Sequence, residues 1–326
     1  MKVIVTGSSG LIGRWVCGYL SELGYEITGV DKRAPDFSLK GLTHADCDIL
    51  DYSRLEEIFC RALPEGLIHL AARTDLDETE SVAGYAANIQ GIRNVLQAVE
   101  KAGSVRRAIY TSSQLVCRVG YIPENMQDYC PNTLYGESKV LTEKLVSELD
   151  GGKTEWCIAR PTTVWGPHMS AHYQRLLHLI RKGLYFHCGK SKLYKSYSYA
   201  GNIAFQYFKL LTVPADKIHG RTFYLADYEP LSLRDYANGL AEEMGSPRIP
   251  DFPKAFVRVL ALFGDLINKL GFSGFPFNSF RLNNILTSYV FDLSETRTVC
   301  GELPFSQADG IRATARWFLE NVEKKA

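Results

Sequence analysis

The sequence predicts an α/β protein: a doubly wound parallel sheet with a smaller, mainly helical C-terminal lobe. Three observations predict this fold class. Over roughly the first 160 residues, short apolar runs alternate with longer amphipathic stretches, which is the rhythm of strand–helix–strand units. The first apolar run leads directly into a glycine-rich turn. The chain of 326 residues is also long enough to bury such a sheet and a second lobe without disulfides or metal ions.

The predicted strands are apolar over nearly their whole length, as expected for a sheet covered by helices on both faces. They cover residues 2–6, 26–31, 66–71, 107–112 and 155–160. Amphipathic helices are expected between them, at residues 11–23, 52–62, 81–101 and 134–149. Parallel strands joined by helices require right-handed crossovers, so this order predicts a doubly wound sheet.

After about residue 166 the pattern changes to longer helical stretches. These cover residues 173–182, 233–244, 256–270 and 308–323, with a connector rich in Phe, Gly, Pro and Ser at 271–280. We therefore expect one domain over residues 1–166 and a smaller lobe over 167–326. Residues 222–226 have the composition of one more strand, so part of the lobe, about 195–228, is expected to return to the first domain.

The composition excludes several classes of protein. The 37 basic and 36 acidic residues are scattered along the chain, which argues against a nucleic-acid-binding protein. No membrane span is expected, because the apolar stretch 255–262 is interrupted by Arg258 and followed by Asp265. Met1 and Lys2 lead straight into a strand and not into an export signal. The eight cysteines form no Cys-x-x-Cys pair, so we expect reduced thiols in a cytoplasmic protein.

The turn after the first strand has glycine at positions 7, 10 and 13. Glycine at these places lets the backbone turn tightly and approach a diphosphate group at the start of the next helix. Asp31 ends the second strand eighteen residues after the last of these glycines, where a carboxylate can bind the adenosine ribose of a dinucleotide. An acid here repels a 2′-phosphate and so favours NAD. The adjacent Lys32 and Arg33 leave NADP open.

A second group of residues has the chemistry of a proton-transfer site. Tyr135 and Lys139 are four residues apart in a predicted helix, so their side chains share one face. A nearby ammonium group favours the phenolate form of a tyrosine, which suits a general acid/base. Ser112 and Ser113 end a predicted strand, and the carboxyl ends of parallel strands are where such sheets bind ligands.

With these motifs the chain resembles the extended short-chain dehydrogenase/reductase family, in its NAD-dependent nucleotide-sugar epimerase/dehydratase branch. The resemblance implies a Rossmann-type fold. It runs in order over about the first 170 residues and continues weakly through Tyr199 to Asn202, Tyr224 to Asp227, and Phe291-Asp292. The matching positions are Gly7, Gly10, Gly13, Asp31, Asp48-Ile49, His69 to Ala72, Asn88, Ser113, Tyr135, Lys139, Arg160-Pro161 and Gly166-Pro167.

The resemblance implies three sets of site residues. Ser113, Tyr135 and Lys139 would be catalytic. The cofactor NAD would be held by Gly7, Ser9, Gly10, Leu11, Ile12, Gly13, Asp31, Lys32, Asp48, Ile49, Leu70, Ala71, Ala72, Asn88, Thr111, Tyr135, Lys139, Pro161 and Thr163. A nucleotide-sugar substrate would touch Arg73, Ser113, Gln114, Thr163, His168, Lys195 and Arg281.

Departures from the family narrow the expected reaction. In the related family, sugar-nucleotide 4,6-dehydratases have an Asp-Glu pair at the positions of Gln114 and Leu115. Decarboxylating relatives keep a glutamate at the position of Leu115, so neither dehydration nor decarboxylation is expected. The primary expectation is 4-epimerisation of a nucleotide sugar through a transient 4-keto intermediate. The alternatives are an NAD(P)H-dependent reductase or dehydrogenase of a 4-keto nucleotide sugar or a 3β-hydroxysteroid-like substrate, and a non-catalytic dinucleotide sensor.

Two further expectations concern assembly and metals. Relatives pair the helices that correspond to residues 81–101 and 134–149 across a two-fold axis, which implies a homodimer. His168, His172 and His178 lie close together in the sequence, but no cysteine or carboxylate stands at matching spacing, so no metal site is expected.

Overall fold

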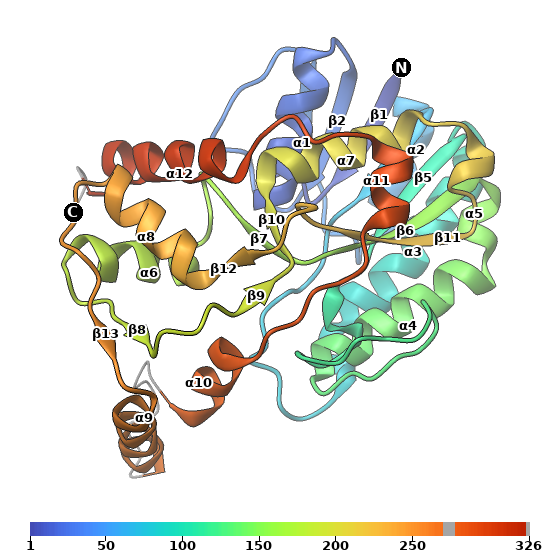
Figure 1. Cartoon of the computed structure of the whole chain (residues 1–326). Coiled ribbons are helices and arrows are strands. Elements are labelled where there is room, and N and C mark those ends of the chain that lie inside the picture. The colour runs from blue at the N-terminus through green and yellow to red at the C-terminus, as the bar shows by residue number, and fades with distance from the viewer. Residues whose placement is uncertain (270–277, 324–326) are drawn as a thin grey trace. The chain divides into compact units, whose positions relative to one another are not determined.

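The computed structural model describes residues 1–269 and 278–323 and contains the predicted parallel sheet (Figure 1). Its seven strands lie in the order β11-β6-β5-β4-β1-β2-β3, and all pairs are parallel. The strands are β1 (Lys2–Thr6), β2 (Glu26–Asp31), β3 (Leu42–Asp46), β4 (Gly66–His69), β5 (Arg107–Thr111), β6 (Glu155–Pro161) and β11 (Arg221–Leu225). The expected doubly wound fold is therefore confirmed.

The strand order creates one place where the direction of winding reverses. From β1 the chain builds outward through β2 and β3, then returns to place β4 on the other side of β1 and continues outward through β5 and β6. Ligands of open α/β sheets bind at the carboxyl ends of the strands at such a point. The carboxyl ends of β1 and β4 are therefore where a dinucleotide is expected.

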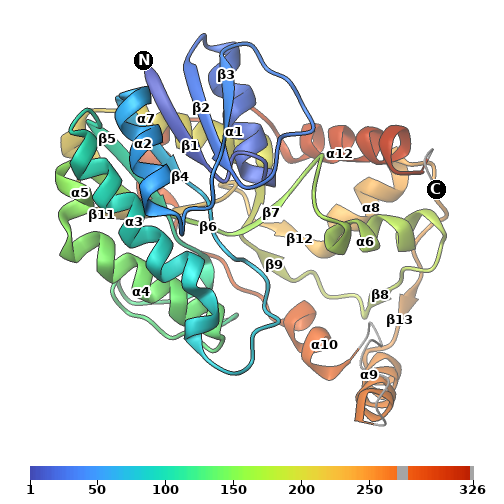
Figure 2. The same cartoon turned by 180° about the vertical axis from the view of Figure 1, so that it is seen from behind.

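Helices cover both faces of this sheet (Figures 1 and 2). One face carries α1 (Leu11–Glu22), α7 (Ala200–Thr212) and α11 (Ser294–Cys300); the other carries α2 (Tyr52–Ala62), α3 (Ala86–Ala102) and α4 (Leu134–Glu148), which is followed by α5 (Asp150–Lys153). Each face has its own apolar core, with Val16 and Tyr207 in the first and Leu55 and Val95 in the second. Short 3-10 turns complete the layer: η1 (Val82–Tyr85), η2 (Gln114–Val116) and η3 (Ala215–Lys217).

The chain divides into two compact units. The first contains Met1–Val164, Ser198–Tyr228 and Phe291–Pro304, and the second contains Trp165–Tyr197, Glu229–Val290 and Phe305–Ala326. The two-domain division made from the sequence did not include the third segment of the first unit. That segment contributes α11, whose Val299 and Cys300 join the core around α7.

The second unit is mainly helical. Its helices are α6 (Ala171–Arg181), α8 (Leu233–Glu243), α9 (Lys254–Lys269), α10 (Ser279–Leu286) and α12 (Gln307–Asn321). Short strands β8 (His187–Cys188) and β13 (Asp251–Phe252) pair in parallel, and β9 (Tyr194–Lys195) pairs antiparallel with β12 (Leu231–Ser232). The strands β7 (Thr163–Trp165) and β10 (Tyr197–Tyr199) lie where the chain passes from one unit to the other. Among the described helices, none is long and apolar enough to cross a bilayer.

Candidate active site

The glycine turn between β1 and α1 leaves no space for side chains on its inner side. Gly7 has a φ of 71°, and a Cβ atom there would lie 2.7 Å from the backbone N of Ala71. A Cβ atom on Gly13 would lie 2.2 Å from the carbonyl oxygen of Gly7, whereas one on Gly10 would meet only that oxygen, at 3.2 Å. The turn is therefore closed toward the protein and open outward at a helix N-terminus, which suits a diphosphate group.

Substitution of Gly13 tests this packing. Gly13→Ala is expected to lower the free energy of unfolding by about 1–3 kcal/mol, because its Cβ atom would collide with backbone atoms. Gly18→Ala on the same helix is the matched control, since a Cβ atom there meets nothing within 4 Å. The control should raise the free energy of unfolding by about 0.5–1 kcal/mol. Urea denaturation measures both, and equal stability of the two variants would contradict the account.

Asp31 lies beside this turn, at the end of β2. One carboxylate oxygen accepts a hydrogen bond from the backbone N of Ser9 at 3.0 Å, and the other accepts one from the backbone N of Arg33, also at 3.0 Å. The Ser9 hydroxyl in turn donates to the carbonyl oxygen of Arg33 at 2.7 Å. Lys32 between them is exposed. The acid predicted to bind a ribose is therefore joined directly to the turn predicted to bind the diphosphate.

The segment after β4 is hydrogen-bonded to the last residue of β1. The hydroxyl of Thr6 accepts hydrogen bonds from the backbone N atoms of Leu70 and Ala71, both at 3.2 Å. Thr6 also bonds to Nδ1 of His69 at 2.7 Å, and burial lowers the pKa of this imidazole to about 3. His69 is thus a neutral group that holds β1 and β4 together. Ala72 continues this segment.

Asn88 on α3 connects this segment to the helix that carries the predicted catalytic pair. Its amide oxygen accepts from the backbone N of Arg73 at 2.8 Å, and its amide nitrogen donates to the Arg73 carbonyl oxygen at 3.0 Å. The same nitrogen donates to the hydroxyl of Ser138 on α4 at 2.9 Å. Asn88 therefore fixes the position of α4 relative to the loop after β4.

Asp48 and Ile49 lie in the loop between β3 and α2, which begins at the carboxyl end of β3. Asp48 accepts a hydrogen bond from the backbone N of Leu50 at 3.0 Å. Ile49 is buried against α3, where a Cβ atom on Gly91 would lie 2.5 Å from its Cδ1 atom. Both residues are thus held in a tight turn next to α3.

Tyr135 and Lys139 lie one turn apart near the start of α4, and both are buried. Thr133 caps this helix by accepting a hydrogen bond from the backbone N of Gly136 at 3.0 Å. The ammonium group of Lys139 donates to the carbonyl oxygen of Thr111, the last residue of β5, at 3.0 Å. The lysine is therefore held at the carboxyl end of β5, whose last residue comes two positions before Ser113 in the sequence.

Burial also sets the charge of Lys139. Desolvation lowers the pKa of its ammonium group to about 8, and the carboxylate of Glu143 acts against this shift. The folded protein therefore holds a buried cation that loses its proton near the upper end of the physiological range. Such a group suits a site where a negative oxygen develops during the reaction.

The residues around Ser113 leave a polar atom without a partner. The Ser113 hydroxyl accepts from the backbone N of Leu115 at 3.1 Å, and the amide nitrogen of Gln114 lies 3.3 Å from the hydroxyl of Thr163. The amide oxygen of Gln114 is buried and has no hydrogen-bond partner within the described chain. A buried acceptor left unpaired is costly unless a ligand supplies a donor. Pro161 and Thr163 complete this edge at the end of β6 and in β7.

A buried ion pair behind α4 was missed by the sequence analysis. The guanidinium of Arg160 donates to both carboxylate oxygens of Glu143, each at 2.7 Å, and to the carbonyl oxygen of Met126 at 2.6 Å. The hydroxyl of Tyr129 donates to the same carboxylate at 2.9 Å. The pair therefore fixes the segment between Ser113 and α4. Glu143 stands one helical turn after Lys139, and no local pattern marks it.

The remaining predicted substrate residues lie in different parts of the chain. Arg73, in the first unit, makes ion pairs with Asp75 at 3.0 Å and Glu78 at 3.1 Å. His168 and Lys195 belong to the second unit. Arg281 lies in α10, and its side chain is outside the described residues.

His168 and Lys195 are both held by neighbours within the second unit. His168 has a φ of 70°, and its ring lies 5.3 Å from that of Trp317. The ammonium group of Lys195 donates to the carbonyl oxygen of Asn284 at 2.6 Å, and burial lowers its pKa to about 8.

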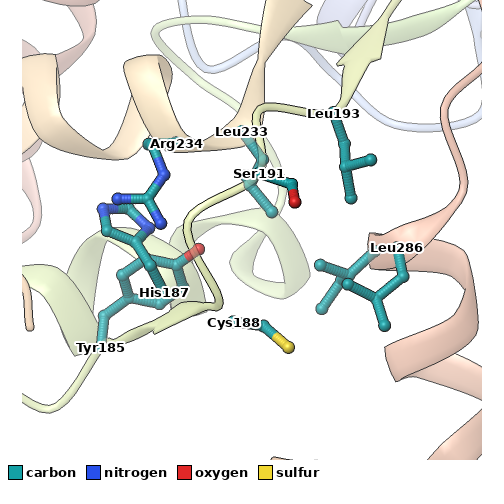
Figure 3. A pocket seen from close by; sticks show the side chains of 9 residues that line it. Tyr185, His187, Cys188, Ser191, Leu193, Leu233, Arg234 and Leu286 are labelled. Atoms are coloured by element: carbon teal, nitrogen blue, oxygen red, sulfur yellow. The ribbon is translucent and has the colours of Figure 1, made fainter. Parts of the chain in front are cut away.

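The second unit also contains a small hollow (Figure 3). Its volume is about 40 Å³, and all of its lining residues belong to the second unit. Within the part of the chain that the structure describes, no three His, Cys, Asp or Glu residues form a metal-binding group. The residues that line the hollow are Tyr185, His187, Cys188, Ser191, Leu193, Leu233, Arg234, Ile285 and Leu286.

Three known proteins show what the chain is similar to. A 3 beta-hydroxysteroid dehydrogenase/Delta 5-->4-isomerase of Mycobacterium tuberculosis is 27% identical over 264 residues, which cover 75% of this chain and 70% of that protein. An N-acetyl-alpha-D-glucosaminyl-diphospho-ditrans,octacis-undecaprenol 4-epimerase of Escherichia coli O157:H7 is 25% identical over 332 residues, 99% of this chain and 97% of that protein. The crystal structure of a UDP-glucose 4-epimerase from Thermotoga maritima with UDP-glucose superposes with a TM-score of 0.75 at 20% identity, covering 99% of this chain and 100% of that one.

The family model agrees with the geometry of the first unit. The model of the NAD dependent epimerase/dehydratase family matches residues 3–226. The matched region begins in β1 and ends just after β11, so it contains the glycine turn, Asp31, Ser113, Tyr135 and Lys139. The chain therefore belongs to the NAD dependent epimerase/dehydratase family.

Proposed function

We propose that the protein catalyses NAD(P)-dependent oxidoreduction at a secondary alcohol of a nucleotide sugar, as a 4-epimerase that acts through a transient 4-keto sugar. The observation that carries this proposal is the buried pair on α4: Tyr135 and Lys139 share one helix face, and Lys139 is held on the last carbonyl oxygen of β5, two residues before Ser113. Membership of the family and the two relatives named as 4-epimerases support the proposal.

NAD fits the residues at the carboxyl ends of β1 and β2. The glycine turn is open outward at the start of α1, where backbone N–H groups would hold the diphosphate. Asp31 would bind the adenosine ribose, with Asp48 and Ile49 beside the adenine. The carboxylate of Asp31 would repel the 2′-phosphate of NADP, so we propose NAD in preference to NADP. When bound, the nicotinamide would supply hydride transfer.

The chain's own residues would orient the sugar and move the proton. Tyr135 would remove the proton of the 4-hydroxyl group, and Ser113 would donate a hydrogen bond to the same oxygen. The buried ammonium of Lys139 would stabilise the phenolate of Tyr135 and hold the nicotinamide ribose. The unpaired amide oxygen of Gln114 would accept a hydrogen bond from another hydroxyl of the sugar.

Three residues of the second unit are proposed to bind the nucleotide part of the substrate. We assign His168, Lys195 and Arg281 to the nucleotide and its diphosphate, because each carries a group that can donate hydrogen bonds to phosphate or base oxygens. Arg73 and Thr163, which belong to the first unit, are assigned to the sugar.

A homodimer through α3 and α4 is also proposed, since these helices pack side by side on one face of the sheet.

The charge of Lys139 makes the reaction sensitive to alkaline pH. Its pKa of about 8 means that the ammonium is charged below that pH and neutral above it. Stabilisation of the phenolate is therefore lost as the pH rises through about 8, and kcat is expected to fall. A profile from about pH 6 to about pH 10 measures this. Lys139→Arg, which stays charged, should lower kcat but remove the alkaline fall. An unchanged profile in that variant would contradict this role.

A second candidate function is a reductase or dehydrogenase that releases its cofactor at every turnover. The similarity to a protein named as a 3 beta-hydroxysteroid dehydrogenase favours it. The two functions differ in cofactor use, because an epimerase needs only catalytic amounts of NAD, whereas a reductase consumes one equivalent of reduced cofactor for each product.

The experiment follows from that difference. Any dinucleotide bound to the purified protein is released by denaturation and identified, and nucleotide sugars are then screened for conversion without added cofactor. Bound NAD with redox-neutral conversion is the expected result. A protein that converts a keto substrate only while it consumes NADH or NADPH would contradict 4-epimerisation and support the second candidate.

A further inference from the structure

Helix α9 carries large apolar side chains on the side that does not pack against the second unit. Val259, Leu262 and Phe263 are 64%, 62% and 62% exposed, and Phe256 and Leu266 are about half exposed. The buried positions of the same helix are Val257, Ala261 and Gly264. A helix of a water-soluble domain normally buries its large apolar residues and exposes small or polar ones.

The packed side of α9 explains its small residues but not its large ones. Val257 and Ala261 form an apolar cluster with Leu282 of α10, which lies beside α9 (Figure 1). Small side chains at this contact allow the two helices to approach closely. The large side chains therefore do not stabilise this contact and remain exposed to solvent, as the apolar residues of an interaction surface do.

The exposed apolar residues form one continuous face. At 100° per residue, they span an arc of about 160° on the helix. Lys254, Arg258 and Asp265 lie together in a narrow arc that separates this face from the packed side on one border. The apolar positions are 256, 259, 260, 262, 263 and 266.

The first turns of α9 are basic. Lys254 and Arg258 are both exposed, and the ammonium group of Lys254 donates to the hydroxyl of Ser191 at 3.2 Å. Lys190 and Lys192 stand on either side of that serine, so they add charge next to the start of the helix. Lys192 is compensated by Asp235, at 2.9 Å. The border of the apolar face therefore has a net positive charge, with Lys254 and Arg258 against the single carboxylate of Asp265.

The size and charge of this face distinguish between occupants. Six half-exposed apolar side chains present roughly 500 Å², less than the ~800 Å² that each partner of a stable protein dimer buries. A single helix with a broad apolar face and basic residues at its border is sufficient to lie in the head-group region of a bilayer, where the cations meet lipid phosphates. The observations therefore favour a membrane surface over a second copy of the chain.

We propose that α9 docks the protein on the surface of a bilayer that contains anionic phospholipids, with its apolar face below the head groups and Lys254 and Arg258 beside the lipid phosphates. The helix lies in the plane of the membrane and does not span it. This inference concerns a surface of the second unit and is independent of the proposed reaction.

Co-sedimentation of the full chain with vesicles tests the proposal. Vesicles of phosphatidylcholine are compared with vesicles that also contain about 30% phosphatidylglycerol. The protein is expected to bind the anionic vesicles, and Leu262→Glu/Phe263→Glu is expected to lower that binding by about 10-fold or more. Leu184→Glu is the matched control, because this leucine is 63% exposed in the same unit but outside α9. It should bind like the unchanged protein.

Charge and assembly provide two further measurements. Arg258→Ser should weaken binding to the anionic vesicles and leave any binding to phosphatidylcholine unchanged. The proposal is overturned if the unchanged protein binds neither vesicle, or if Leu262→Glu/Phe263→Glu and Leu184→Glu bind alike. It is also overturned if sedimentation analysis shows an oligomer that only the double variant dissociates while no vesicle is bound. The face would then be a contact between copies of the chain.

Discussion

Tyr135→Phe is expected to lower kcat by about 10³-fold, the largest effect on activity among the substitutions considered. The phenol is the group that would exchange a proton with the sugar, and no other phenol on α4 could replace it. The ring itself is buried and lies 5.9 Å from that of Tyr85, so the aromatic packing remains in the variant. The variant should fold normally, and its far-UV circular dichroism and thermal unfolding should resemble those of the unchanged protein.

Tyr110→Phe is the matched control for this prediction. Tyr110 is also buried, and its hydroxyl donates to the carbonyl oxygen of Gly151 at 2.8 Å, away from the carboxyl end of the sheet. Loss of that hydrogen bond should lower the free energy of unfolding by about 1 kcal/mol and leave kcat within about 2-fold. The role of Tyr135 would be contradicted if its variant kept activity comparable to that of the control.

Glu143→Gln is expected to have the largest effect on stability. It leaves the buried guanidinium of Arg160 without a countercharge, which should lower the free energy of unfolding by about 3–5 kcal/mol. Replacing both partners, as Glu143→Leu with Arg160→Met, should recover most of this loss, because an apolar pair leaves no buried charge. Urea denaturation measures the free energy of unfolding of the unchanged protein, of Glu143→Gln and of the double variant.

An exposed ion pair is the control for the buried one. Arg54 and Glu57 form a pair at 2.6 Å on the surface of α2, and both side chains are about half exposed. Glu57→Gln should change the free energy of unfolding by less than about 0.5 kcal/mol. If Glu143→Gln cost no more than this control, the buried pair would not hold α4 and the segment at Met126 in place.

Most strands of the sheet could be predicted from the sequence because burial on both faces makes them largely apolar. The exception is β3, whose Leu42-Thr43-His44-Ala45-Asp46 run is polar because it lies at the edge of the sheet. Helix α7 is not among the helices that the sequence predicts, although it packs on α1 in the core. Its first residues, from Ala200, are marked in the sequence only by their resemblance to a family motif.

In the candidate site, too, features set by nearby residues can be predicted from the sequence, whereas contacts between distant residues cannot. The glycine turn, Asp31 and the pair on α4 have spacings that sequence alone reveals. The hydrogen bond from Lys139 to Thr111 and the ion pair of Glu143 with Arg160 join residues 28 and 17 positions apart. Such contacts arise only when β5, β6 and α4 are packed together, so no local pattern could predict them.

In the proposed reaction the sugar is inverted at carbon 4 without net oxidation. The most direct measurement uses a nucleotide sugar with deuterium at carbon 4 and follows the label by mass spectrometry and NMR. The expected product is a 4-epimer that keeps the deuterium at carbon 4, with none in the solvent, because the hydride would be removed and returned within one active site. Transfer of the label to free reduced cofactor, or its loss to water, would contradict the proposed epimerisation.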